Sequence, residues 1–269
     1  MLCADAWGQA VSCRGYAMRV RLVIQYMGAK YVGWQVQPNG VSVQALMEEE
    51  LHKLTGKPVT LHASGRTDSG VNARAQVAHF DTDARIPADK YAYALNTGLP
   101  RDISVMYSDE AEGFHARFDV TKKHYRYCVE NRPHASAINR DTALHVHAPL
   151  DIALLNDAAK AIIGTHDFSA FKSAGTKTEN AVRTIYKSMW TQEGRLLCYD
   201  VAGSGFLYNM VRILVGTMLT IGTGKYDQDQ IIKALDSGIR SDAGPTAPAH
   251  GLTLYRVEYT DFDTEDYVC

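Results

Sequence analysis

The sequence predicts an α+β protein made of two ferredoxin-like halves, each with the element order β-α-β-β-α-β and an antiparallel sheet. Residues 19–107 and 125–259 show the same succession of strand-like and helix-like segments, which indicates an internal duplication. The 269 residues are 46% hydrophobic and 22% charged, enough to bury a substantial core. We expect a binding cleft between the two halves.

The first half begins with a strand, because residues 19–26 alternate in the two-residue period of a half-buried strand. A helix follows, with Ser42 as N-cap, apolar residues at helical spacing from Val43 to Leu54, and Gly56 and Pro58 as stop signals. Residues 59–63 and 76–80 are predicted strands on either side of a glycine-containing loop. A helix over 87–96 and a strand over 103–107 complete the half.

The second half repeats this order with longer elements. Strands are predicted over 125–130, 182–190, 196–201 and 252–259, and helices over 150–163 and 206–221. Asp151 can cap the first of these helices and Gly164 can end it, whereas Gly222 and Gly224 end the second. The predicted organisation is a dispensable N-terminal extension (1–17), an N-terminal half (18–115), a C-terminal half (116–260) and an acidic tail (261–269).

Several classes of protein are disfavoured. The longest apolar stretch, residues 206–221, contains Asn209 and Arg212, so no membrane span is expected, and the first 17 residues lack a secretory signal pattern. We therefore expect a cytoplasmic protein. Five scattered cysteines without a Cys-x-x-Cys pair argue against a disulfide framework and a zinc site, and His145 and His147 lack a third ligand, so no metal is assigned.

The charge distribution limits where a nucleic acid could bind. The chain has 28 basic and 30 acidic residues, a net charge of −2, but four of the acids lie in residues 261–269. Basic side chains concentrate between His115 and Arg126, where only Asp119 opposes them. A surface for nucleic acid must therefore be a local stripe, because no global positive field attracts the phosphates.

One loop combines a carboxylate with two glycines. Gly65 and Gly70 bracket residues 66–69, including Asp68, and glycine permits positive φ and close approach of a ligand. A plain turn, in which Asp68 bonds its own backbone, is one interpretation, and a catalytic carboxylate is the other. A phosphate-binding loop is disfavoured, since the chain has no G-x-x-x-x-G-K-S/T motif.

Residues 65–80 resemble the signature of the TruA family of tRNA pseudouridine synthases. They read GRTDSGVNA followed by QVAHF, and Asn72 stands where the family usually has His. The resemblance spans residues 19–259, in ordered blocks at 31–35 (YVGWQ), 114–118 (FHARF), 125–127 (YRY), 166–171 (HDFSAF), 182–185 (VRTI), 206–212 (FLYNMVR) and 247–252 (APAHGL).

The resemblance implies the pseudouridine synthase fold and an isomerase acting on uridines 38, 39 and 40 in the anticodon stem-loop of tRNAs. It also implies a homodimer and no cofactor or metal. The reaction breaks the N1–C1′ bond, turns the uracil, joins C5 to C1′ and removes the C5 proton. A buried carboxylate suits the first step, either as a nucleophile or as a base at C2′, and the sequence leaves both routes open.

The resemblance also assigns site residues. Asp68 is the expected catalytic carboxylate, with Arg66 and Arg212 keeping it ionised and oriented; Arg212 lies in an apolar helix and needs a partner if buried. Tyr125 is expected to stack on the uracil and help remove the C5 proton, and Leu252 to line the pocket. The stripe expected to contact RNA comprises residues 114–118 and the basic side chains Arg117, Lys122, Lys123 and Arg126.

The sequence permits other interpretations. Strand residues such as Tyr125 and Leu252 are commonly core residues, and Arg66 could be a solvated loop charge. A non-catalytic RNA-binding module of two ferredoxin-like units should show a K/R-G-F/Y-G/A-F run, which is absent. A carboxylate-dependent hydrolase needs a second acid near Asp68, and the next are Asp81 and Asp83 beyond a strand. A pseudouridine synthase acting on another RNA would share the same motif.

Overall fold

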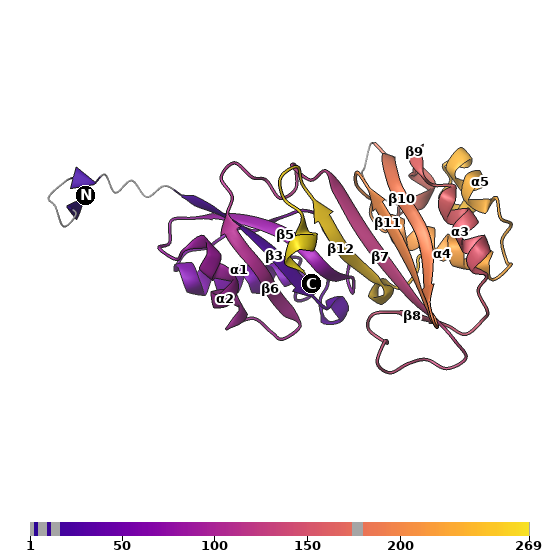
Figure 1. Ribbon diagram of the computed structural model, residues 1–269, viewed down its shortest axis with the longest axis horizontal. Coiled ribbons are helices and arrows are strands. Elements are labelled where there is room, and N and C mark those ends of the chain that lie inside the picture. Colours follow the sequence, from indigo (N-terminus) through magenta and orange to yellow (C-terminus); the bar gives the residue numbers. More distant parts are fainter. Residues whose placement is uncertain (1–2, 5–9, 12–16, 174–179, 269) are drawn as a thin grey trace.

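One ten-stranded sheet runs along the long axis of the molecule (Figure 1). The computed structural model describes residues 3–4, 10–11, 17–173 and 180–268. The strand order is β6 (Ile103–Glu110), β3 (Met18–Tyr26), β5 (Asn72–Thr82), β12 (Leu252–Glu258), β7 (Lys122–Asn131), β11 (Leu196–Gly203), β10 (Val182–Glu193) and β9 (Gly164–Asp167). The short strands β4 (His62–Ala63) and β8 (Leu144–Val146) pair with β5 and β7.

Each half has the ferredoxin-like strand order. In the first half, β6, β3, β5 and β4 lie side by side and every pair is antiparallel; in the second half, β12, β7, β11 and β10 do the same. If the four strands of each half are numbered along the β-α-β-β-α-β sequence, both sheets have the spatial order 4-1-3-2. The predicted duplication is therefore confirmed.

The two antiparallel sheets join into one through a short parallel contact between β5 and β12, at Asn72–Thr253 and Ala73–Leu254. Only the start of β5 makes this contact, because its later residues Ala78 and His79 pair with β4 instead. The strand neighbours of β5 thus change along its length. The connection from β4 to β5, residues 64–71, lies where the two halves separate.

Helices accompany both halves, with α1 (Val43–Thr55) and α2 (Tyr91–Asn96) beside the first and α3 (Ile152–Lys160), α4 (Met210–Gly222) and α5 (Gln230–Ser237) beside the second (Figure 1). The Ser42 hydroxyl accepts the Ala45 N–H and Gly56 closes α1 in the left-handed conformation at φ +73°, as predicted. Asp151 caps α3, but Gly164 begins β9 and does not end that helix. Helix α5 and strands β8 and β9 were not predicted from the sequence.

The C-terminal segment, predicted as an acidic tail, also carries buried apolar side chains. Glu265 and Asp263 form ion pairs with Arg74 and Arg256. Residues 261–268 pack onto the sheet: Phe262 and Tyr267 stack, and Val268 is fully buried. These apolar side chains convert an acidic stretch into a packed terminal segment. At the other end, β1 (Cys3–Ala4) and β2 (Ala10–Val11) form a separate two-stranded sheet, and most of predicted extension 1–17 lies outside the described residues.

Candidate active site

Asp68 opens into a cavity of about 690 Å³ that both halves line. This volume lies within the ~300–1,000 Å³ of typical ligand sites. The first half contributes the loop 64–68, and the second half contributes Lys123 and Tyr125 of β7, residues 206–211 at the start of α4, and Leu252 of β12. The predicted cleft therefore exists, and the predicted catalytic loop forms part of its wall.

A neighbouring segment holds the Asp68 loop from behind. The Trp34 N–H donates to the Thr67 carbonyl at 3.2 Å, and the Thr67 hydroxyl lies 2.7 Å from the Tyr26 hydroxyl. Gly33 has φ +100°, and a Cβ atom there would come within 2.5 Å of the Thr67 carbonyl oxygen. Close packing of the YVGWQ block therefore fixes the backbone on which Asp68 stands.

The Asp68 side chain is not used by its own turn. The Asp68 backbone carbonyl accepts the Val71 N–H at 3.1 Å, which closes the turn without the carboxylate. Among described residues, the one hydrogen-bond partner of the carboxylate is Arg212, whose Nη1 lies 3.3 Å from Oδ2. The plain-turn interpretation is thus disfavoured, because the carboxylate is left to the cavity.

Arg212 reaches Asp68 from the first turn of α4. Its Nε donates to the Ala247 carbonyl at 2.7 Å, and its Nη1 also donates to the Asn209 side-chain oxygen at 2.8 Å. Asn209 has φ +61°, the left-handed conformation that Asn tolerates better than most residues, and this residue precedes the helix. Arg212 is 17% exposed, so these partners satisfy a guanidinium that is mostly withdrawn from water.

Two effects oppose one another at the Asp68 carboxyl. Burial raises its pKa above the usual range, and the Arg212 guanidinium lowers it, with burial the larger effect. The carboxylate is therefore poorly solvated but paired with a cation. Such an anion is more reactive toward a bound substrate than one surrounded by water.

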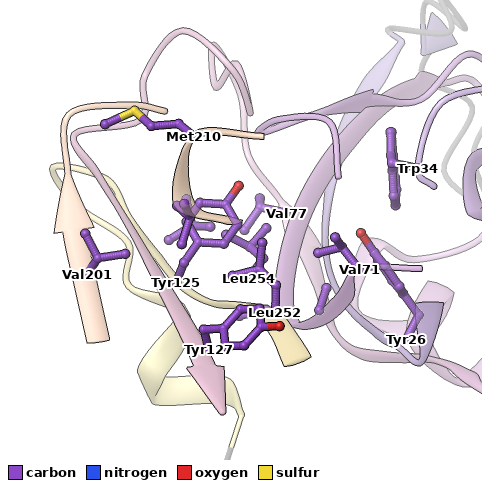
Figure 2. Close-up of a cluster of buried hydrophobic side chains, with 14 of the residues drawn as sticks. Tyr26, Trp34, Val71, Val77, Tyr125, Tyr127, Val201, Met210, Leu252 and Leu254 are labelled. Carbon is purple, nitrogen blue, oxygen red and sulfur yellow. The ribbon is translucent and has the colours of Figure 1, made fainter. Parts of the chain in front are cut away.

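Tyr125 lies beside Asp68 in the cavity wall and is 8% exposed. Its ring meets Phe206 edge to face at 5.1 Å, and Figure 2 shows Tyr125 next to Leu252 and Leu254, with Val71 and Tyr26 of the first half opposite. Burial and the nearby Asp68 charge raise the pKa of Tyr125 far above its usual value. The phenol stays protonated at neutral pH, which suits stacking and hydrogen bonding better than proton removal.

The predicted basic residues divide between the two faces of the sheet. Arg66, Arg117 and Lys123 line the cavity, where Asp68 is the one acidic residue among the described lining residues. Lys122 and Arg126 lie elsewhere, in ion pairs with Glu258 and Asp200 at 2.7 and 2.8 Å. Alternation along β7 explains this division, because Lys123 and Tyr125 share one face of the strand.

Arg66 and Lys123 differ in their surroundings. Arg66 is exposed, and no hydrogen bond or ion pair joins it to another described residue, so Arg212 alone pairs with Asp68. The Lys123 ammonium donates to the Ser64 carbonyl, next to the Asp68 loop, and burial lowers the pKa of Lys123 to about 8. Lys123 therefore links the second half to the Asp68 loop of the first.

Sequence reasoning missed several residues of the site. Asn209 orients Arg212, Gly33 permits the loop contact, and His62 and Tyr208 line the cavity. The only available signal was their position within or next to the family blocks, because each acts through tertiary contacts. In the part of the chain that the structure describes, no group of three His, Cys, Asp or Glu side chains could hold a metal ion. No helix described there is long and apolar enough to cross a bilayer.

Comparison with known sequences identifies the family of the chain. The family described as tRNA pseudouridine synthase matches residues 22–119 and 158–260. The chain is 45% identical over 242 residues to tRNA pseudouridine synthase A of Brevibacillus brevis, covering 90% of this chain and 99% of the relative. Identity to the proteins of the same name from Ruminiclostridium cellulolyticum and Bacillus subtilis is 44% and 46%, with the same coverage.

Comparison with solved structures gives a looser match. A chain of the structure titled "Crystal Structure of a Cbf5-Nop10-Gar1 Complex" aligns with a TM-score of 0.33 and 10% identity, over 82% of this chain and 50% of that one. This match is too loose to support an argument. The family match and the relatives suffice, since both cover most of the chain and the family match includes residues 22–119: the chain belongs to the TruA family of tRNA pseudouridine synthases.

Proposed function

We propose that this protein isomerises uridine to pseudouridine at positions 38, 39 and 40 of the anticodon stem-loop of tRNAs, with Asp68 as the catalytic carboxylate. The observation that carries the proposal is the Asp68–Arg212 pair beside Tyr125, in a cavity shared by both halves. The names of its relatives support tRNA as the substrate.

The site residues take roles that follow from their surroundings. Asp68 either attacks C1′ as a nucleophile or takes the C2′ proton to give a glycal, and on both routes the N1–C1′ bond breaks while the enzyme retains the uracil. Tyr125 stacks on the uracil as a neutral phenol, and Leu252 excludes water from the base. Formation of the C5–C1′ bond then displaces the Asp68 carboxylate or is accompanied by return of the proton to C2′. C5 loses its proton and N1 gains one, so the isomerisation has no net gain or loss of atoms.

The tRNA backbone approaches along the basic wall of the cavity. Arg66, Arg117 and Lys123 give the cavity three cations against the single Asp68, although the whole chain carries a net charge of −2. Counterion release from phosphates bound there makes the affinity fall with salt. The opposite-face residues Lys122 and Arg126 are already paired with acids, which favours a structural role for them.

The proposal extends to organisation and setting. The enzyme works as a cytoplasmic homodimer in which one tRNA contacts both subunits, and it needs no metal or cofactor. The two halves, residues 18–115 and 116–260, each supply one wall of the site, while 1–17 is dispensable. The family match, which begins at residue 22, supports the last point. Light scattering tests the dimer, and an enzyme lacking residues 1–17 should keep its activity.

Release of tritium tests the function. tRNA carrying C5-tritiated uridine is incubated with wild type and with Asp68→Ala, and tritium in water is measured together with free uracil. We expect tritium release by wild type only, because the C5 proton leaves only when C5 joins C1′. Free uracil would indicate a hydrolase, and binding without release by wild type would indicate a binding module; either outcome overturns the proposal.

A further inference from the structure

An exposed phenylalanine on the cavity wall has no role in the mechanism above. Phe118 lies in the connection between β6 and β7 and is 75% exposed, yet it lines the same cavity as Asp68. Isolated apolar side chains on a surface are ordinary. A ring that borders a basic cavity within reach of the substrate is a different case, because aromatic faces bind unstacked bases.

The Phe118 ring stacks on one member of a cluster of three histidine rings. It lies 4.2 Å from the ring of His115 at an interplanar angle of 29°. His79 meets His115 edge to face with ring centres 4.7 Å apart, and His62 lies 5.1 Å from His79 and 5.9 Å from His115. Among the described residues, His115 is the only ring that stacks on Phe118, and the Phe118 side chain is 75% exposed, so much of its ring is open to a further stacking partner.

Hydrogen bonds fix this group of rings before any ligand arrives. The Nδ1 atom of His115 accepts hydrogen bonds from the backbone N–H groups of Arg117 and Phe118 at 3.2 and 3.3 Å. The backbone N–H of His115 donates to the Asp119 carboxylate at 2.6 Å. His79 Nδ1 likewise accepts the Ala116 N–H at 3.1 Å. The turn that presents Phe118 is therefore preorganised, which reduces the entropy lost on binding.

Neutral rings and cations both surround Phe118. Burial lowers the pKa of His115, and it lowers that of His79 to about 4, so these imidazoles are neutral at pH 7. The Arg117 guanidinium lies 6.0 Å from the centre of the Phe118 ring, and Lys123 lines the same cavity. A neutral π-face beside two cations matches a nucleotide with its base unstacked.

We infer that Phe118 is a stacking platform for an unpaired base of the tRNA that neighbours the target uridine. The inference rests on the proposed function for its substrate. Tyr125 holds the target base deep in the cavity, and Phe118 holds a second base at its mouth. Its contribution is to binding and to the choice of site, because its ring lies apart from the Asp68–Arg212 pair.

The test measures binding and stacking separately. An anticodon stem-loop RNA carries 2-aminopurine in place of a nucleotide next to the target, and the full-length protein is titrated into it. For Phe118→Ala we expect Kd to rise on the order of tenfold and the stacking-dependent quenching of 2-aminopurine to disappear. Phe118→Trp should restore both, whereas Phe118→Leu should restore neither, because a leucine supplies apolar area without a π-face.

Tyr93 is a matched control, since it is an aromatic residue of equal exposure (74%), lies on α2 and is not part of the cavity. Tyr93→Ala should leave Kd unchanged. Wild-type affinity for Phe118→Ala, or equal behaviour of the Leu and Trp variants, overturns the inference. So does a change confined to molar mass in light scattering, which would make Phe118 a contact between copies of the chain. Tritium release by wild type establishes the function separately, so the two failures are distinguishable.

Discussion

Replacing Arg212 with methionine tests whether its charge keeps Asp68 ionised. The two groups are 3.3 Å apart and each side chain is only 17% exposed, so little solvent screens them. Removing such a neighbour raises a carboxyl pKa by roughly 1–3 units, which is about 1.4–4 kcal/mol of lost preference for the anion. Burial already raises the pKa of Asp68, and Arg212 is the one group that opposes it.

The assay is the pH dependence of tritium release under single-turnover conditions, from pH 5 to 9. If the reaction requires ionised Asp68, the acid limb of the Arg212→Met profile should move upward by roughly 1–3 units. Activity at high pH should recover in part, because deprotonation becomes complete there. Arg212→Lys retains a positive charge and should show a smaller displacement of the same limb.

A uniform loss of rate would refute this reasoning. If Arg212→Met lowers the rate by the same factor at every pH, the guanidinium acts through geometry alone, by its bonds to Ala247 and Asn209. Circular dichroism and tRNA affinity, measured on the same samples, show whether the variant is folded and binds substrate.

Three further predictions concern the loop, its support and a buried histidine. Asp68→Asn should bind tRNA with near wild-type affinity in filter binding but release no tritium, and substantial activity would contradict the mechanism. Gly33→Ala should lower kcat more than Gly113→Ala. Both glycines have positive φ, but only at Gly33 would a Cβ atom meet backbone, 2.5 Å from the Thr67 carbonyl oxygen. Equal effects of the two substitutions in steady-state kinetics would refute the packing argument. His79 is protonated near pH 6.5 in the unfolded chain, but burial lowers its pKa to about 4 in the folded chain. The free energy of unfolding should therefore fall by about 3 kcal/mol as the pH drops through this range. Urea unfolding of His79→Gln should show a weaker dependence on pH, and an unchanged dependence would show that His79 is not responsible.

Local signals predicted the elements well. Ser42 and Gly56 mark the start and the end of α1, and Asp151 marks the start of α3. These residues are predictable because a cap acts on the nearest backbone groups. The order of strands and helices followed from periodicity. The parallel contact between β5 and β12 could not be predicted this way, since the pairing of Asn72 with Thr253 depends on how the two finished halves meet.

The site was less accessible from residues alone. Asp68 and Arg212 are 144 positions apart in the sequence, so only the family resemblance predicts that they form a pair. The stripe predicted to contact RNA includes Lys122, Lys123 and Arg126, although the two-residue period of a strand already separates Lys123 from Lys122 and Arg126. The acidic composition of residues 261–269 predicts an exposed tail. The burial of Phe262 and Val268 could not be predicted from it, because that burial depends on a surface formed by distant strands.

Nucleotide-resolved mapping of pseudouridine in cells tests the central claim most directly. A strain lacking this gene is complemented with wild type or with Asp68→Ala, and pseudouridine is mapped across its RNAs. We predict that wild type restores pseudouridine at positions 38 to 40 of tRNAs and that Asp68→Ala restores none. Restoration by Asp68→Ala, or restoration by wild type only in another RNA, would contradict the account.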